Sequence, residues 1–262
     1  MSRKIVFFDV DGTISSEETF AIPESTIKAM KRAQANGHIM YINTGRPASS
    51  IEDQIKALPI DGFVMGCGTH VTYHGKTILH HTIDGALADK IIQVSLKTNV
   101  ENVLEGANGT YYPEHLRNPM NIHFRDRYKS QGFPVFDYDE NSHVSFDKMA
   151  LWYFPDSDIE TWKETFKDDL DYIQRDVDFI ENVPKGYSKA TGIKAIIDYL
   201  GIPLEDTISI GDSTNDLPML EYTKESVAMG NANPAIFDSV SYITTDINDN
   251  GIWNALDHFG LL

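Results

Sequence analysis

The chain has 262 residues, of which 41% are hydrophobic and 23% are charged, so it can bury a sizeable core in one or two domains. Its formal net charge of -17 argues against nucleic acid as a partner, because phosphate backbones are bound through positive surfaces. A single cysteine excludes an intramolecular disulfide, and no apolar stretch is long enough to cross a membrane. We expect a cytoplasmic protein with no membrane partner, either a monomer or a small homo-oligomer.

Two carboxylates follow the first predicted strand. Residues Ile5–Phe8 form an unbroken apolar run, typical of a strand buried on both faces, and Asp9 and Asp11 come directly after it. Ligands of open α/β sheets bind at this end of the strands. Two such close carboxylates call for a cation, and their hard oxygen atoms favour Mg²⁺. A carboxylate held beside Mg²⁺ can attack phosphorus; the alternative interpretation is a polar turn in which Asp11-Gly12 is merely good turn chemistry.

The second predicted strand, over His38–Asn43, ends in Thr44-Gly45-Arg46-Pro47. Pro47 suits the first position of a helix, which we expect over Ala48–Leu58. A hydroxyl and backbone N–H groups at a helix N-terminus can bind a phosphate oxygen, and Arg46 adds positive charge. An ordinary strand-to-helix loop with Thr44 as the N-cap explains the same residues.

The stretch that follows is too long for one connection in a compact domain, so it must carry structure of its own. Strand and helix patterns alternate along it, which indicates an α/β cap inserted into the chain. The expected elements are a hairpin over Val71–Ile78, helices over Gly85–Thr98 and Ile159–Leu170, and strands over Val100–Glu105, Lys148–Phe154 and Phe179–Val183. We predict a catalytic core over residues 1–82 plus 185–262, and a cap over residues 83–184 that selects the substrate.

A lysine opens the next predicted helix. Apolar residues recur at helical spacing over Ala190–Leu200, which places Lys189 at the N-terminus of that helix. The helix dipole disfavours a cation there, which points to a function such as offsetting the charge of a phosphate. The alternative is a solvated lysine.

The third predicted strand, over Thr207–Ile210, leads into a turn with two further carboxylates. Asp212 and Asp216 are four residues apart, so a helical turn puts both on one side, where they can hold a cation or anchor its ligands. The alternative, an acidic turn that complements a helix dipole, explains one aspartate better than two.

Taken in this order, the four segments resemble the motifs of the haloacid-dehalogenase superfamily of phosphotransferases, and specifically its Cof-like branch of sugar-phosphate phosphatases. The matching residues are Asp9-Val10-Asp11-Gly12-Thr13, Thr44-Gly45-Arg46, Lys189 and Gly211-Asp212-Ser213-Thr214-Asn215-Asp216. Residues 227–232 and 249–252 are also similar to the C-terminal part of that branch. The resemblance implies an α/β fold in which a Rossmann-like parallel-sheet core carries an inserted α/β cap.

The resemblance also implies a role for each matching residue. Asp9 would be the nucleophile, and Asp11 the general acid that later activates water. Thr44 and Lys189 would bind the transferring phosphoryl group. The remaining implied contacts are substrate binding by Gly45, Arg46 and Asn215, and a Mg²⁺ site formed by Asp9, Asp212 and the backbone carbonyl of Asp11, with Asp216 supporting these ligands. One departure is Cys67, which stands in Gly66-Cys67-Gly68-Thr69 where the branch usually has an asparagine.

We therefore predict a Mg²⁺-dependent phosphatase of small phosphomonoesters, such as sugar or polyol phosphates, that works through an aspartyl-phosphate on Asp9. A phosphosugar mutase would use the same residues and return the phosphoryl group to a second hydroxyl. We also consider a phosphatase of pyridoxal phosphate or flavin mononucleotide, and a phosphosugar-binding regulator without turnover.

Overall fold

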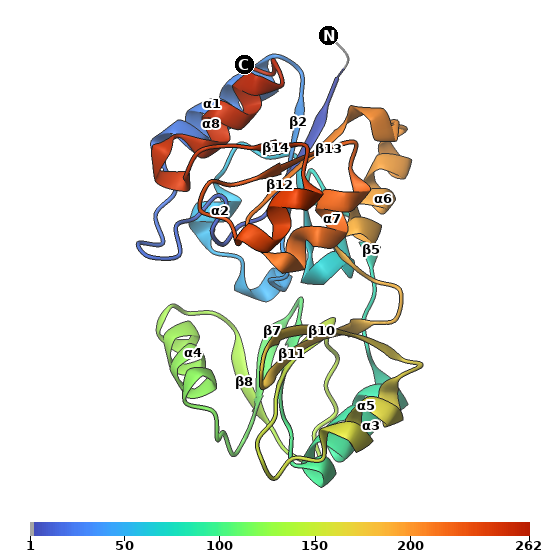
Figure 1. Ribbon diagram of the computed structural model, residues 1–262. Helices are drawn as coiled ribbons and strands as arrows, with labels where there is room; N and C mark the ends of the chain where they lie inside the picture. Colours follow the sequence, from blue (N-terminus) through green and yellow to red (C-terminus); the bar gives the residue numbers. More distant parts are fainter. Residues whose placement is uncertain (1–2) are drawn as a thin grey trace. The chain divides into compact units, whose positions relative to one another are not determined.

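The computed structural model describes residues 3–262, and these form two compact units (Figure 1). The first unit comprises Met1–Gly45, Asp53–Leu79 and Ser188–Leu262. The second comprises His80–Tyr187 together with the short segment Arg46–Glu52. Most of the second unit is thus inserted between two parts of the first along the sequence. Across residues 3–262, none of the helices combines the length and the apolar character that crossing a bilayer requires.

The first unit is built on an eight-stranded sheet with the order β14-β13-β12-β1-β2-β3-β4-β5. Neighbouring strands from β14 to β3 pair in parallel, and β4 pairs antiparallel with β3. The strands are β1 (Ile5–Phe8), β2 (Ile39–Asn43), β3 (Gly62–Met65), β4 (His70–Tyr73), β5 (Lys76–His80), β12 (Thr207–Gly211), β13 (Glu225–Ala228) and β14 (Tyr242–Ile243).

The longer helices of this unit are arranged in two pairs, α1 beside α8 and α6 beside α7 (Figure 1). All four residues of β1 are 0% exposed, because side chains on both faces of the sheet are covered. The helical segments are α1 (Glu24–Ala35), α2 (Asp53–Lys56), η2 (Gly66–Gly68), α6 (Lys189–Leu200), η3 (Leu204–Asp206), η4 (Thr214–Asp216), α7 (Leu217–Tyr222), η5 (Pro234–Ser239), η6 (Ile247–Asp249) and α8 (Gly251–His258). The predicted α/β class with a parallel sheet is confirmed.

The helix predicted over Ala48–Leu58 is wrong. The chain forms the short 3-10 helix η1 (Ala48–Ser50), becomes extended at Ile51 (φ -74°, ψ 119°) and then forms α2. Pro47 is also extended (ψ 159°) and precedes the helical turn instead of opening it. The β-branched side chain of Ile51 is 2% exposed, so its burial takes precedence over a continuous helix.

The second unit has a six-stranded sheet with the order β10-β11-β9-β6-β7-β8. Its pairs are antiparallel except for β7 with β8. Helices α3 and α5 lie side by side (Figure 1), and their apolar residues share a buried cluster with the sheet that includes Ile91, Met149 and Trp162. The elements are β6 (Glu101–Gly106), β7 (Gly109–Pro113), β8 (Val135–Tyr138), β9 (Lys148–Trp152), β10 (Leu170–Asp176), β11 (Phe179–Pro184), α3 (Gly85–Thr98), α4 (Pro119–Ser130) and α5 (Ile159–Phe166).

Four elements of the second unit were absent from the sequence-based expectations: α4, β7, β8 and β10. The helix expected to end at Leu170 ends at Phe166, because Leu170 opens β10 and is buried against the apolar cluster. Within the second unit, η1 contacts β6 and β7.

Candidate active site

Asp9 lies directly after β1, at the C-terminal end of the central strand. Its N–H donates to the carbonyl oxygen of Ile210 on β12 (3.0 Å), which extends the parallel pairing of the two strands by one residue. The side chain is 5% exposed, and its Oδ1 accepts a hydrogen bond from Lys189 Nζ (2.6 Å). The backbone hydrogen bonds between β1 and β12 thus fix the position of the Asp9 backbone, and with it the place of the carboxylate.

Two glycines allow the carboxylates that follow β12 to approach neighbouring turns. Gly12 has φ +77°, and a Cβ at this position would lie 2.4 Å from Asp212 Oδ2. A Cβ at Gly211 would lie 2.6 Å from Asp216 Oδ2. Thr13 donates its hydroxyl to Asp212 Oδ1 (2.7 Å). Both glycines are therefore required by close packing against a carboxylate, in addition to any role in turning the chain.

Asp216 is 0% exposed and uses both carboxylate oxygens within the protein. Oδ1 accepts from Lys189 Nζ (2.5 Å), whereas Oδ2 accepts from the backbone N–H groups of Asp212 (3.0 Å) and Ser213 (3.1 Å). This arrangement suits a residue that orients the lysine and the turn.

Lys189 is the first residue of α6 and is 2% exposed. The helix start is fixed by a capping box, in which the Ser188 hydroxyl accepts the N–H of Thr191 and the Thr191 hydroxyl accepts the N–H of Ser188. The ammonium group forms ion pairs with Asp9 and Asp216. These two carboxylates overcome the unfavourable helix dipole at this position.

The carboxylates outnumber the single buried cation at this edge of the sheet. Burial raises the pKa of Asp9 well above its usual value, with further increases from Asp216, Asp212 and Asp11 and a decrease from Lys189. Burial and then the charge of Asp216 raise the pKa of Asp212 to about 7. Burial alone would lower the pKa of Lys189, but Asp216 and Asp9 raise it above its ordinary value, so the ammonium stays charged.

The donor set at this edge fits a hard divalent cation. Among the described residues, Asp9, Asp212 and Asp216 offer carboxylate oxygens that lie within 4.8 Å of one another. The set contains only oxygen donors, as Mg²⁺ prefers, and a cation would offset the burial of negative charge and the mutual repulsion that together raise the pKa values of Asp9 and Asp212.

The other predicted site residues lie in different surroundings. Thr44 is 1% exposed and directly follows β2, where its N–H donates to Val64 (2.9 Å). Arg46 belongs to the second unit and forms an ion pair with Glu52 (3.1 Å). Asn215 accepts a hydrogen bond from the Ser213 hydroxyl. Gly45 belongs to the first unit, next to Thr44, and is partly exposed.

Asp11 is partly exposed and lies outside the group of three close carboxylates, yet its charge contributes to the raised pKa of Asp9. It is therefore near enough to Asp9 for the two charges to interact.

Two asparagines that support this site were not singled out from the sequence. Asn43, the last residue of β2, donates its side-chain N–H to the carbonyl oxygen of Lys189 (3.2 Å). Asn231 donates to the carbonyl oxygen of Gly12 (2.7 Å) and accepts the N–H of Ile247 (2.9 Å). Their positions at strand ends were a weak signal, since the partners are far away in the sequence.

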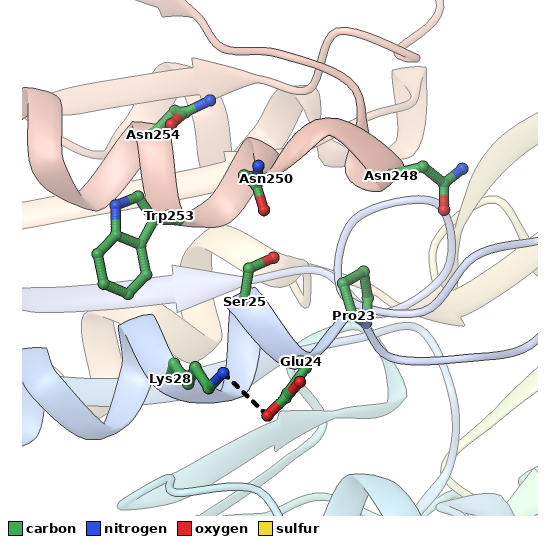
Figure 2. A pocket seen from close by; sticks show the side chains of 8 residues that line it. All are labelled: Pro23, Glu24, Ser25, Lys28, Asn248, Asn250, Trp253 and Asn254. Atoms are coloured by element: carbon green, nitrogen blue, oxygen red, sulfur yellow. Dashed lines mark ion pairs between the residues drawn. The ribbon is translucent and has the colours of Figure 1, made fainter.

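A surface groove of about 650 Å³ lies between α1 and α8 (Figure 2). Glu24 and Lys28, which lie on one side of it, form an ion pair (2.9 Å). Most of the lining side chains are polar. The lining consists of Pro23, Glu24, Ser25, Lys28, Asn248, Asn250, Trp253 and Asn254. None of the predicted site residues belongs to this lining.

Comparison with known proteins identifies the relatives of the chain. The family model described as haloacid dehalogenase-like hydrolase matches residues 6–256. YkrA of Bacillus subtilis (strain 168) is 30% identical over an alignment that covers 100% of both chains. A further relative from the same organism, the 5-amino-6-(5-phospho-D-ribitylamino)uracil phosphatase YitU, is 24% identical, with 97% of each chain covered.

Solved structures agree over the whole chain. The sugar phosphatase BT4131, described as a member of subclass IIB of the same superfamily, superimposes with a TM-score of 0.82 at 28% identity, covering 99% of this chain and 100% of that one. A protein from Geobacillus kaustophilus HTA426 gives a TM-score of 0.83 at 28% identity, with both chains fully covered. The resemblance drawn from the four motifs is thereby confirmed.

Proposed function

Because this chain belongs to the haloacid dehalogenase-like hydrolases, we propose that it is a Mg²⁺-dependent phosphatase that hydrolyses small phosphomonoesters through a covalent intermediate on Asp9. Hydrolysis of phosphoric monoesters is the activity that its relatives support. The observation that carries the proposal is the close group of Asp9, Asp212 and Asp216, two of which, Asp9 and Asp216, form ion pairs with the buried Lys189.

In the first step, a carboxylate oxygen of Asp9 attacks phosphorus. The bond between phosphorus and the leaving oxygen breaks, and Asp11 gives that oxygen its proton. Lys189 stays positively charged, because its pKa is raised by its two aspartate partners, and it offsets the negative charge of the phosphoryl oxygens. The products of this step are the free alcohol and an aspartyl-phosphate.

In the second step, water attacks the same phosphorus. Asp11, now a carboxylate, takes a proton from the water, and the bond between phosphorus and Asp9 breaks. Inorganic phosphate leaves and both aspartates return to their starting protonation states. Thr44, directly after β2, would bind a phosphoryl oxygen through its hydroxyl in both steps.

The metal would be held by the carboxylates of Asp9 and Asp212 and by the backbone carbonyl of Asp11, with Asp216 orienting the surrounding groups. When bound, Mg²⁺ supplies positive charge that lowers the cost of bringing a phosphate dianion to several carboxylates. The chain has a net charge of -17, so the electrostatic potential at the site must be made locally positive for an anionic substrate to approach.

The proposed substrates are sugar and polyol phosphates. Two relatives support this class: BT4131 is described as a sugar phosphatase, and YitU as a phosphatase of a phosphoribitylamino compound. The second unit, with residues 83–184 as its main part, would supply the side chains that choose the leaving group. Gly45, Arg46 and Asn215 remain proposed substrate contacts.

A substrate panel tests this proposal. Sugar phosphates, 5-amino-6-(5-phospho-D-ribitylamino)uracil, pyridoxal phosphate, flavin mononucleotide and nucleotides are incubated with Mg²⁺ or with excess chelator, and released phosphate is measured. We expect release from a sugar or polyol phosphate that chelator abolishes. Isomerised phosphosugar without net phosphate release would establish a mutase, and binding without any turnover would establish a regulator.

A further inference from the structure

The first turn of α6 lies against the turn η2 with no side chain between them. Gly68 in η2 has φ +94°, and a Cβ there would lie 2.0 Å from the carbonyl oxygen of Ser188. Gly192 faces it from α6, where a Cβ would lie 2.3 Å from Val64 Cγ1 and 3.0 Å from Gly68 Cα. The two glycines thus allow the backbones of η2 and α6 to touch, and a side chain at either position would push the two segments apart.

This contact lies at the place where the helix presents Lys189. Ser188 is the N-cap, Lys189 follows it, and Gly192 is one turn further along. On the other side, the fully buried Asn43 donates its side-chain N–H to the Lys189 carbonyl oxygen (3.2 Å). The backbone around Lys189 is therefore fixed from β2 and from η2 together.

The same turn also fixes the residue after β2. The N–H of Cys67, in the middle of η2, donates to the carbonyl oxygen of Thr44 (3.2 Å). Cys67 has φ +54° and is 3% exposed, and it makes this contact through its backbone N–H. One turn of chain thus holds both residues proposed to bind the phosphoryl group.

We propose that Gly68, Gly192 and Asn43 are positioning residues that set the place of the Lys189 ammonium group between Asp9 and Asp216. Their catalytic consequence rests on the proposed function of Lys189. The ammonium lies 2.6 Å and 2.5 Å from the two carboxylates, so a small shift of the helix start breaks at least one ion pair. A misplacement of about 1 Å can cost about 10²-fold in rate.

Kinetics of Gly192→Ala provide the first test. We expect kcat/KM to fall by about 10²-fold with Lys189 present, and by less than about 3-fold in the Lys189→Ala background, since the effect acts through that lysine. Val64→Ala, which removes the closest clashing atom, should restore part of the rate. Equal losses in the two backgrounds would overturn the proposal.

Gly68→Ala needs a matched control, because an alanine at a position with positive φ is destabilising whether or not it meets a neighbouring atom. Gly37 has φ +92°, and a Cβ added there would meet no atom within 4 Å, so Gly37→Ala carries the same backbone strain without the contact. We expect Gly37→Ala to keep the parent rate when folded, whereas Gly68→Ala loses it. A Gly68→Ala variant that is folded and fully active would contradict the proposal.

Chemical labelling gives a readout that needs no turnover. Lys189 is 2% exposed and Lys194, on the same helix, has a side chain that is 60% exposed. Acetic anhydride followed by mass spectrometry should label Lys194 equally in all variants, and Lys189 several-fold faster in Gly192→Ala and Asn43→Ala than in the parent. Unchanged protection of Lys189 would refute the positioning role, even if the parent proved to have no phosphatase activity. If the parent had no phosphatase activity but Lys189 were labelled faster in the two variants, the proposed function would be refuted and the positioning role would stand.

Discussion

At the scale of single residues, the site depends on one lysine shared by two aspartates. Lys189 donates to Asp9 and to Asp216, and Asp212 lies beside them with its carboxylate against Gly12. The ammonium group and the carboxylates stabilise one another's charges, because an isolated buried charge is strongly unfavourable. Single substitutions here should therefore affect catalysis and ionisation together.

Asp9→Asn should abolish turnover, because the change keeps the shape of the side chain and removes the nucleophile. We expect a loss of at least about 10⁴-fold in kcat, with an unchanged far-UV circular dichroism spectrum. Asp198→Asn is the matched control, since the side chain of Asp198 is 61% exposed on α6 and should have no effect. Substantial activity in Asp9→Asn would rule out the assigned nucleophile.

Lys189→Ala should lower kcat/KM by about 10²- to 10³-fold, the usual cost of removing a group that stabilises charge in the transition state. The comparison is Lys194→Ala, which removes an exposed lysine from the same helix. Steady-state kinetics at saturating Mg²⁺ measure both. A parent-like rate in Lys189→Ala would show that another group compensates the phosphoryl charge.

At the scale of elements, one buried carboxylate holds the start of α4. Glu101, the first residue of β6, is 3% exposed and accepts the N–H groups of Arg117 (2.5 Å) and Asn118 (3.1 Å). The side chain of Asn121 donates to its other oxygen (2.5 Å). Asn121 is the buried residue of α4, so a polar contact joins the start of this helix to β6.

Glu101→Ala should consequently destabilise the protein by about 2–3 kcal/mol, since it leaves buried donors without an acceptor. Urea unfolding measures the change in the free energy of unfolding. Glu160→Ala, at an exposed position of α5, should change it by less than about 0.5 kcal/mol. A Glu101→Ala variant as stable as this control would mean that water replaces the lost contacts at no cost.

Elements with a clear apolar pattern were predictable from the sequence, whereas α4 was not. The helix over Gly85–Thr98 forms with the expected bounds, because Ile91 and Ile92 belong to a regular buried face. In α4, Met120 and Ile122 are exposed and only Phe124 and Tyr128 form a short, partly buried aromatic pair, so the apolar pattern of this helix is weak. The N-cap Asn118 accepts the N–H of Met120 in the first turn, and Glu101, far away in the chain, accepts the N–H groups of the two residues that precede the helix.

The same distinction applies to the candidate site. Asp9 and Asp212 were expected at one edge because each follows a predicted strand of a parallel sheet, and in the structure β1 and β12 are adjacent parallel strands. Asn43 and Gly68 could not be identified, because their roles are contacts with α6 that no local pattern encodes. The catalytic roles of the individual residues stay predictions until they are tested by substitution.

At the scale of the whole molecule, the charge of -17 makes stability depend on protons and metal. Asp9 and Asp212 have raised pKa values, the latter about 7, so the folded metal-free protein retains protons that the unfolded chain releases near pH 4. The stabilising contribution of Asp212 is complete below about pH 4 and is lost as the pH rises through about 7, whereas that of Asp9 is lost as the pH rises through its own raised pKa.

Thermal unfolding should show this directly. Without metal, the melting temperature is expected to fall between pH 5 and pH 8, and Asp212→Asn should reduce that slope because one of the two groups is removed. Mg²⁺ binds the ionised carboxylates, so it should raise the melting temperature more at pH 8 than at pH 5. A Mg²⁺ concentration of 100 times Kd raises the free energy of unfolding by about 2.7 kcal/mol. An Mg²⁺ effect independent of pH and of Asp212 would place the metal elsewhere.

The covalent step on Asp9 is tested most directly by trapping it. The enzyme is mixed with a substrate identified from the panel, quenched in acid during turnover, and digested for mass spectrometry. The account predicts one phosphoryl group on the peptide that contains Asp9, absent in Asp9→Asn and when Mg²⁺ is chelated. Rapid turnover with no phosphoryl group on that peptide, or with the group on another residue, would contradict it.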